Sequence, residues 1–141
     1  MSITPAAGLF LITGRSRSQV EDAVNSDIAK AFALNIPAQM WAAHGVEHPL
    51  GHDFTGAQDL MPQTLDEQTV LSYTARVPAS LMKEFFLTGT PQEVVDQVAH
   101  WRDRGLRYLV VMNLSILQPS LRSGLEANAP FVRILRALKK L

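Results

Sequence analysis

Two short segments of this chain are apolar at most of their positions, and they constrain its fold more than any other feature. Leu9–Ile12 contains no polar residue, and 106–112 reads LRYLVVM, with β-branched residues in its second half. A strand with one wet face alternates polar and apolar residues, whereas a continuous apolar run indicates a strand buried on both faces. Pro5 before the first run and Gly14 after it favour a strand over a piece of buried helix. We therefore predict strands over 3–13 and 106–112.

Helix start signals occupy much of the remaining chain. Ser18, Thr64 and Thr90 are each followed by a glutamate three residues later, which is the pattern of a capping box. The predicted segments are a helix over 18–34, a long loop over 35–63, short helices within 64–86, a helix over 90–104 and a last helix over 129–141. With the two strands this order is βαβα, which predicts an α/β fold with a parallel strand pair and a right-handed crossover.

The predicted sheet is unfinished. Each of its two strands is apolar on both faces, and each has an open edge, whereas parallel strands need cover on both faces. The predicted helices suffice for one face only. The pattern therefore indicates part of a larger sheet or barrel. The alternative is a third strand within 36–63, which would give a small self-contained α/β domain.

Composition narrows the class of protein. The chain has 141 residues, of which 47% are hydrophobic and 18% charged, against roughly 25% charged in typical soluble domains. Thirteen basic residues balance thirteen acidic ones, which gives no electrostatic reason to expect nucleic acid or an anionic membrane as partner. The absence of cysteine excludes disulfides and thiolate zinc sites. No apolar run approaches the roughly 20 residues of a transmembrane helix, and no signal-peptide pattern is present. We therefore expect a cytoplasmic protein.

The segment 88–113, TGTPQEVVDQVAHWRDRGLRYLVVMN, resembles the C-terminal part of the luciferase-like monooxygenase superfamily. Those proteins usually end in a helix that opens Gly-Thr-Pro-Glu-Glu-Val, a glycine stop and the last barrel strand. Here Gly89–Val94 and Gly105 stand in these places, with Gln92 in place of one acid. The stretch GVEHPLGHDF and the ending FVRILRALKKL are most similar to the F420-dependent branch. That branch includes methylenetetrahydromethanopterin reductase-like and phthiodiolone ketoreductase-like enzymes.

This resemblance implies a (β/α)8 barrel that uses FMN or the deazaflavin coenzyme F420. It makes 3–13 strand seven and 106–112 strand eight, with the first six strands and the family's catalytic residues outside this chain. The expected function is that of a C-terminal fragment of an oxidoreductase that performs hydride transfer or monooxygenation on a small-molecule substrate. Such a fragment would be inactive alone and would need the missing barrel portion or further copies of itself. The alternative is a small α/β binding or assembly module that completes its sheet with a partner chain.

Candidate cofactor contacts follow from the place of the active face in such barrels, at the carboxyl ends of the strands. Thr13, Gly14 and Arg15 would lie at one rim position, and Asn113 and Ser115 at the other. The run GRSRS over 14–18 also puts two arginines where a helix begins, which suits an anion. The alternative is that Ser18 only caps that helix and that both arginines are solvated.

Three histidines, His44, His48 and His52, are spaced four residues apart. On one helix they would share a face and could bind a metal ion, but the intervening glycines and Pro49 oppose a continuous helix. We therefore predict no metal site. The expectation is a loop over the barrel mouth, from which His48 or His52 touches the substrate.

Overall fold

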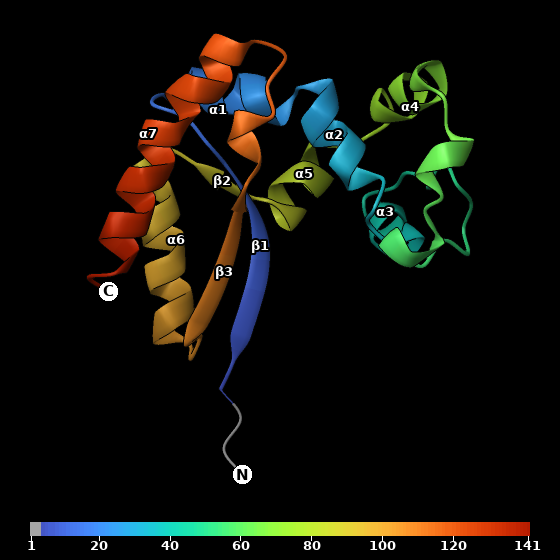
Figure 1. Ribbon diagram of the computed structural model, residues 1–141. Helices are drawn as coiled ribbons and strands as arrows, with labels where there is room; N and C mark the ends of the chain where they lie inside the picture. Colours follow the sequence, from blue (N-terminus) through green and yellow to red (C-terminus); the bar gives the residue numbers. More distant parts are fainter. Residues whose placement is uncertain (1–3) are drawn as a thin grey trace. The chain divides into compact units, whose positions relative to one another are not determined.

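A computed structural model describes residues 4–141 of the chain (Figure 1). The first predicted strand begins at Ile3, which lies outside the described residues. The chain forms two compact units, and each is described by itself. Unit 1 contains the described residues up to Val24 together with Phe85–Leu141, and unit 2 is Asn25–Glu84.

Unit 1 is built on a parallel sheet of three strands in the order β2-β1-β3. These are β1 (Ala6–Thr13), β2 (Leu87–Gly89) and β3 (Tyr108–Asn113). The predicted parallel pair of first and last strand is confirmed, with Ala6–Leu11 of β1 in register with β3. The additional strand is β2, which pairs with Leu11–Thr13 at the other edge of β1. It therefore lies outside 36–63, where the alternative had placed a third strand.

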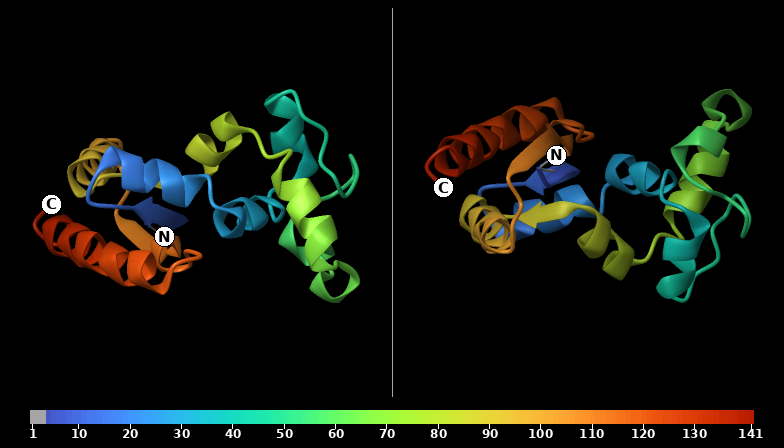
Figure 2. Two further views of the ribbon diagram at one scale, coloured as in Figure 1. Left: turned by 90° about the horizontal axis from the view of Figure 1, so that it is seen from above. Right: turned by 90° about the horizontal axis from the view of Figure 1, so that it is seen from below.

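Two helices cover one face of this sheet, α6 (Pro91–Asp103) and α7 (Leu121–Leu138). They pack against each other, and both lie on the same side of the strands (Figures 1 and 2). Their contact with the sheet forms the core of unit 1. Its fully buried residues are Leu11, Leu87, Val94, Val98 and Ile134. The residues of β1 and β3 that face the helices, such as Leu9 and Val111, pack around this core.

The opposite face of the sheet is largely uncovered along β3. Tyr108, Val110 and Met112 are 62%, 51% and 52% exposed, and they alternate with the helix-facing residues of the strand. Ala6 and Gly8 of β1 lie beside Tyr108 and Val110 in register and are also exposed. We call these five residues the open sheet face. The prediction that the helices cover one face only is therefore correct.

The helix boundaries in unit 1 differ from the predicted ones. The first helix, α1, is Arg17–Val24, and Ser16 rather than Ser18 holds its first turn, with the Gln19 N–H 3.3 Å from Ser16 Oγ. A short 3₁₀ turn, η3 (Leu114–Ile116), follows β3. The last helix begins at Leu121, not at 129, and runs through Pro130. Its buried residues Gly124, Ala127, Pro130 and Ile134 recur every three or four positions, so packing of this stripe overrides the helix-breaking tendency of proline.

Unit 2 is helical. The predicted helix over 18–34 is interrupted, and its second part forms α2 (Asp27–Ala33), because the Ser26 side chain caps a new helix through the Ala29 N–H. The predicted loop over 35–63 contains α3 (Ala38–Ala43) and the 3₁₀ turns η1 (Ala57–Asp59) and η2 (Pro62–Thr64). Further along are α4 (Glu67–Thr74) and α5 (Ala79–Phe85). Asp66, not Thr64, caps α4, with its Oδ1 2.7 Å from the Thr69 nitrogen.

The core of unit 2 forms around Trp41. This side chain is fully buried, and its Nε1–H donates to the carbonyl oxygen of Ala33 at 3.2 Å. Trp41 therefore anchors the segment after Pro37. Within residues 4–141, no helix combines the length and the apolar composition that a membrane crossing requires.

Candidate functional site

The carboxyl ends of β1, β2 and β3 meet at one edge of the sheet in unit 1, because the three strands are parallel. We call this edge the rim and define it as 13–15 at the end of β1, 88–90 at the end of β2 and 113–115 at the end of β3. In parallel α/β folds, ligands bind at this end of the strands. All five predicted cofactor-binding residues belong to the rim.

Three of these five residues form one connected turn. The Thr13 N–H donates to Ser115 Oγ at 2.7 Å, and this bond joins the end of β1 to the turn after β3. The Ser115 N–H in turn donates to Asn113 Oδ1 at 3.1 Å. Gln118 closes the turn by donating its Nε2–H to the Ser115 carbonyl oxygen at 2.8 Å. The structure therefore brings Thr13, Asn113 and Ser115 together, although 102 residues separate the bonded Thr13 and Ser115.

The hydroxyl of Thr13 has unused bonding capacity. Thr13 is fully buried. Within the described part of the chain, its Oγ1 is the buried side-chain nitrogen or oxygen atom that has no hydrogen-bond partner. A buried polar group left in this state costs about 1–3 kcal/mol, so a polar ligand atom at the rim would relieve a real penalty. The donor set of the rim therefore fits a polar cofactor at this position.

Gly14 and Arg15 connect β1 to α1. A Cβ at Gly14 would lie 2.8 Å from the Cβ of Gln19, so only glycine allows the first turn of α1 to pack this closely. The side chain of Gln19 also accepts the Arg15 N–H at 2.8 Å. The guanidinium group of Arg15 is exposed and forms no ion pair with any residue in 4–141. Arg15 therefore offers a free positive charge at the rim.

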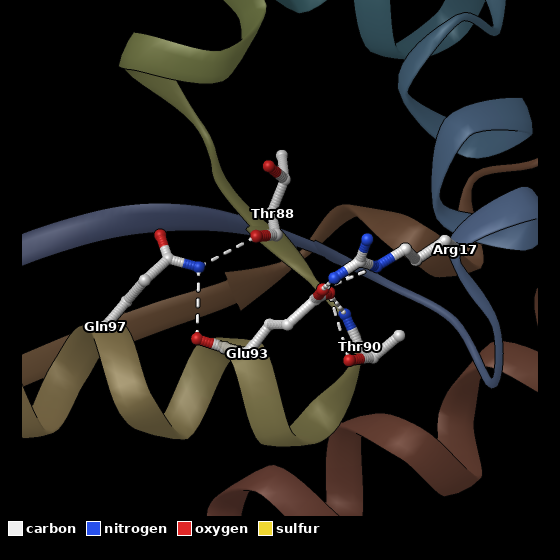
Figure 3. A network of polar contacts seen from close by, with 5 residues as sticks. All are labelled: Arg17, Thr88, Thr90, Glu93 and Gln97. Atoms are coloured by element: carbon white, nitrogen blue, oxygen red, sulfur yellow. Dashed lines mark hydrogen bonds and ion pairs between the residues drawn. The ribbon is translucent and has the colours of Figure 1, made fainter.

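The second arginine of this run, Arg17, is already paired (Figure 3). Its Nη2 lies 2.7 Å from Oε1 of Glu93 on α6. The other oxygen of Glu93, Oε2, accepts the Thr90 N–H at 2.9 Å and the Thr90 hydroxyl at 3.0 Å. This is the predicted capping box at Thr90, and Gln97 supports it by donating to the carbonyl oxygens of Thr88 and Glu93.

These contacts stabilise the charged form of Glu93. The N–H of Thr90 contributes most to lowering the pKa of this carboxyl, followed by the Thr90 hydroxyl and Arg17. The hollow beside them, of about 480 Å³, is lined by three carboxylate side chains, Glu21, Glu93 and Asp96, and by the single cation Arg17. This corner therefore does not suit an anion. Of the two arginines in 14–18, Arg15 is the one available to a phosphate or carboxylate group.

His48 belongs to the core of unit 2. Its ring is 2% exposed, stacks on Phe54 with centroids 4.3 Å apart, and meets Trp41 edge-on at 4.8 Å. Its Nδ1 accepts the Leu50 N–H at 3.1 Å, which leaves Nε2 to donate to the Leu34 carbonyl oxygen at 3.3 Å. Burial is the main cause of the lowered pKa of His48. The structure thus corrects the expected role of His48, because no ring nitrogen remains free for a substrate.

The other two histidines are separate from His48. His52 is exposed, with its Nε2 3.1 Å from Oδ2 of Asp53, and its contact with a substrate stays a prediction. His44 lies between two residues of α5, with Nδ1 2.8 Å from Ser80 Oγ and Nε2 2.6 Å from Glu84 Oε2. This cluster gives no local sequence signal, because Ser80 and Glu84 follow His44 by 36 and 40 residues. In residues 4–141, no group of three or more His, Asp or Glu side chains is placed to hold a metal ion.

The chain is similar in sequence to proteins of known name. No protein-family model matches the chain. It is 59% identical, over all 141 residues, to the phthiodiolone/phenolphthiodiolone dimycocerosates ketoreductase of Mycobacterium tuberculosis (strain H37Rv). The ketoreductase of the same name from Mycobacterium sp. (strain JLS) is 47% identical over the same 141 residues. The resemblance to phthiodiolone ketoreductase-like proteins is confirmed. The chain spans 37% of the length of both relatives.

A solved structure shows the same fold. The coenzyme F420 dependent tetrahydromethanopterin reductase from Methanopyrus kandleri superimposes with a TM-score of 0.53 at 17% identity. The match covers 88% of this chain and 33% of that reductase. The predicted fold class, an incomplete part of a (β/α)8 barrel, is therefore confirmed, and the incomplete sheet of unit 1 agrees with it.

Proposed function

We propose that this chain forms the C-terminal part of an F420-dependent ketoreductase and works together with the remaining strands of its barrel. The observation that carries the proposal is the 59% identity to a ketoreductase along the whole chain. Transfer of a hydride to a ketone carbonyl is the reaction that this relationship supports. Monooxygenation has no comparable support, and F420 is preferred to FMN because the solved structure that shares the fold is named as F420 dependent.

The open sheet face supports the need for further strands. Tyr108, Val110 and Met112 lie on the side of β3 opposite the helices, which in a (β/α)8 barrel is the packed interior. These three large apolar side chains are half exposed or more. Removing their apolar surface from water would contribute roughly 25 cal/mol of stability for each Å². The outer edge of β3 also carries no paired strand among the described residues. The remaining barrel would cover both features.

The rim residues would hold the cofactor. When bound, F420 supplies the hydride chemistry. The Thr13 hydroxyl is buried and free to form a hydrogen bond with a polar cofactor atom, and the guanidinium group of Arg15 is free to pair with an anionic group. Asn113 and Ser115 would fix the turn that presents Thr13. Gly14 would let the first turn of α1 pack against the end of β1 and so position Arg15 at the rim.

Titration of F420 tests the proposal. The chain alone should bind F420 weakly or not at all, since most contacts would lie in the earlier βα units. An equimolar mixture with the part of the M. tuberculosis relative outside the matched region should bind F420 stoichiometrically. Arg15→Gln should weaken this binding about 10-fold, whereas Arg104→Gln, an exposed arginine at the end of α6, should leave it unchanged. Tight stoichiometric binding by the chain alone, or equal losses for both variants, would refute the proposal.

A second candidate is an assembly module in which two copies of the chain cover each other's open sheet face. The three exposed apolar residues of β3 favour this alternative specifically. Analytical ultracentrifugation separates the two cases. A dimer that persists when the rest of the relative is added would support the module, and a dimer displaced by it would support the ketoreductase.

A further inference from the structure

A second concave site lies in unit 1, on the helix side of the sheet. It is a groove of about 570 Å³ between α6, the beginning of β3 and the end of α7. This volume is in the range of about 300–1,000 Å³ that small-molecule sites occupy. Nine of its thirteen lining residues are apolar or aromatic, four are basic, and none is acidic. The groove therefore combines an apolar interior with side-chain charges of a single sign.

The apolar interior continues the core of unit 1. Leu109, Val111 and Leu138 line the groove, and all three are only partly buried where they pack against the core. Val132 and Leu135 of α7 form the opposite wall. An alkyl chain placed here would be in contact with apolar side chains from three elements.

The cations of the groove are not balanced by carboxylates. Arg102 is paired with Asp103 at 2.7 Å, but Arg107 donates only to main-chain oxygens, those of Arg102 and Leu106. Arg136 and Lys139 form no ion pair with any residue in 4–141. The carboxyl-terminal ends of α6 and α7 each contribute about half a negative charge. In the 141-residue chain, Leu141 adds its terminal carboxylate, whose oxygen accepts from Arg102 Nη1 at 3.2 Å. Three unpaired cations therefore leave a surplus of about one positive charge, in a chain whose net charge is zero.

The groove lies mainly on the helix side of the sheet and shares one lining residue, Tyr108, with the open sheet face. Its lining runs along β3 from Tyr108 to Val111, which lies two residues before Asn113 of the rim, about 7 Å at 3.3 Å per residue. The lining residues Leu109 and Val111 point to the helices, and Val110 and Met112 of the open sheet face do not line the groove. Further barrel strands on the open sheet face would therefore lie on the side of β3 opposite the groove wall that Leu109 and Val111 form.

We propose that this groove binds one molecule of a fatty acid, with the alkyl chain along Leu109, Val111 and Leu135 and the carboxylate near Arg107, Arg136 and Lys139. The apolar interior accounts for the chain and the cationic surplus for the carboxylate. One fatty acid molecule can be accommodated in a groove of about 570 Å³. A protein partner would instead bury roughly 800 Å² of the surface of this chain. The proposal does not depend on the ketoreductase function.

Dodecanoate is the probe, titrated into the 141-residue chain by calorimetry. We expect saturable binding of one molecule, which tightens by up to about four-fold for each methylene added between decanoate and dodecanoate. Dodecyltrimethylammonium, with the same chain and the opposite charge, should bind at least 10-fold more weakly. The double variant Arg136→Gln and Lys139→Gln should weaken dodecanoate binding about 10-fold while circular dichroism stays unchanged.

The matched control is Arg133→Gln with Lys140→Gln. Both residues are exposed in the same part of the chain, and neither lines the groove. The control should bind dodecanoate like the unchanged chain. Equal affinity for the anionic and the cationic surfactant, equal losses in both double variants, or no saturable binding of dodecanoate would overturn the proposal. Binding of an acidic amphipathic peptide without binding of dodecanoate would overturn it in favour of a protein partner.

Discussion

The two units of this chain differ in how completely they satisfy their own apolar residues. Unit 2 closes its core around Trp41, where His48 and Phe54 stack and both ring nitrogens of His48 have partners. Unit 1 buries one face of its sheet. On the opposite face, Val110 and Met112 are about half exposed. A unit with few strands can therefore be well packed on one side and still require neighbours on the other. Four predictions test this difference, from the largest expected effect to the smallest.

Removal of the Trp41 side chain should have the largest effect, and it should be confined to unit 2. Trp41→Ala deletes a fully buried indole and its hydrogen bond to Ala33, at a cost of about 3–5 kcal/mol. Hydrogen exchange should show lost amide protection within 25–84 and retained protection in the sheet of unit 1. Gln39→Ala, at an exposed position of the same helix, should change little. Equal loss of protection in both units would show that they are not independently packed.

Two neighbouring residues of β3 should differ in how strongly a polar substitution lowers the free energy of unfolding. Val111→Gln places an amide against α6 and α7 and should cost about 2 kcal/mol of unfolding free energy. Val110→Gln lies on the open sheet face and should change the free energy by no more than about 0.5 kcal/mol. Chemical denaturation of both variants measures the difference. Similar costs at the two positions would mean that the open sheet face is covered in solution.

The stability of unit 2 should fall as the pH drops below about 6.5. Unfolded His48 takes up a proton near its ordinary pKa of 6.5, whereas burial lowers the pKa of folded His48. Between these two values the unfolded state binds more protons, so the free energy of unfolding decreases with decreasing pH and is constant above 6.5. One proton limits the slope to about 1.4 kcal/mol per pH unit.

Denaturation at pH 8 and pH 5.5 measures this effect. His52→Gln is the matched control, since its ring is exposed, and the pH dependence should survive in it. An unchanged stability of unit 2 between these pH values would contradict the neutral, buried state of His48.

The smallest effect is expected at the corner between α1 and α6. Glu93→Gln keeps an acceptor for the Thr90 N–H but loses the charge opposite Arg17, at a cost of about 0.5–1 kcal/mol. Arg17→Gln should cost less than about 0.5 kcal/mol, because its guanidinium group is largely exposed. Asp22→Asn, at an exposed position of α1, is the control for a lost surface charge. A larger cost for Arg17→Gln than for Glu93→Gln would assign the stability of this corner to the ion pair and not to the cap.

Strong local signals in the sequence correspond to elements of the structure. The apolar runs became β1 and β3, and the Thr90–Glu93 capping box with Pro91 opened α6 where expected. The strand β2 was missed because three residues, one of them glycine, produce no periodic signal. The beginning of α7 was missed because its Pro130 suggested a first turn, although packing against the sheet carries the helix through it.

The sequence predicted at which edge of the sheet the residues of the candidate site lie, but not which side chains bond to each other. The ends of the apolar runs indicated that Thr13, Asn113 and Ser115 would lie on one edge of the sheet. The bond from Thr13 to Ser115 and the pair of Arg17 with Glu93 join residues far apart in the sequence, and nothing local distinguishes them from other serines and glutamates. The unsatisfied hydroxyl of Thr13 likewise depends on its complete burial.

The pairing of β1 with β3 has a consequence for the order of folding. The contacts of Trp41 with Ala33 and His48 join residues seven or eight positions apart, whereas the Thr13–Ser115 bond spans 102 residues. Pairing of parallel strands that are far apart in the sequence is slow, because the chain loses the entropy of loop closure before the strand contacts form. Because β1 precedes β3 along the chain, its pairing with β3 has to wait until Asn113 has been made. In that interval the apolar run of β1 lacks this partner strand, and unpaired apolar strands are prone to aggregation.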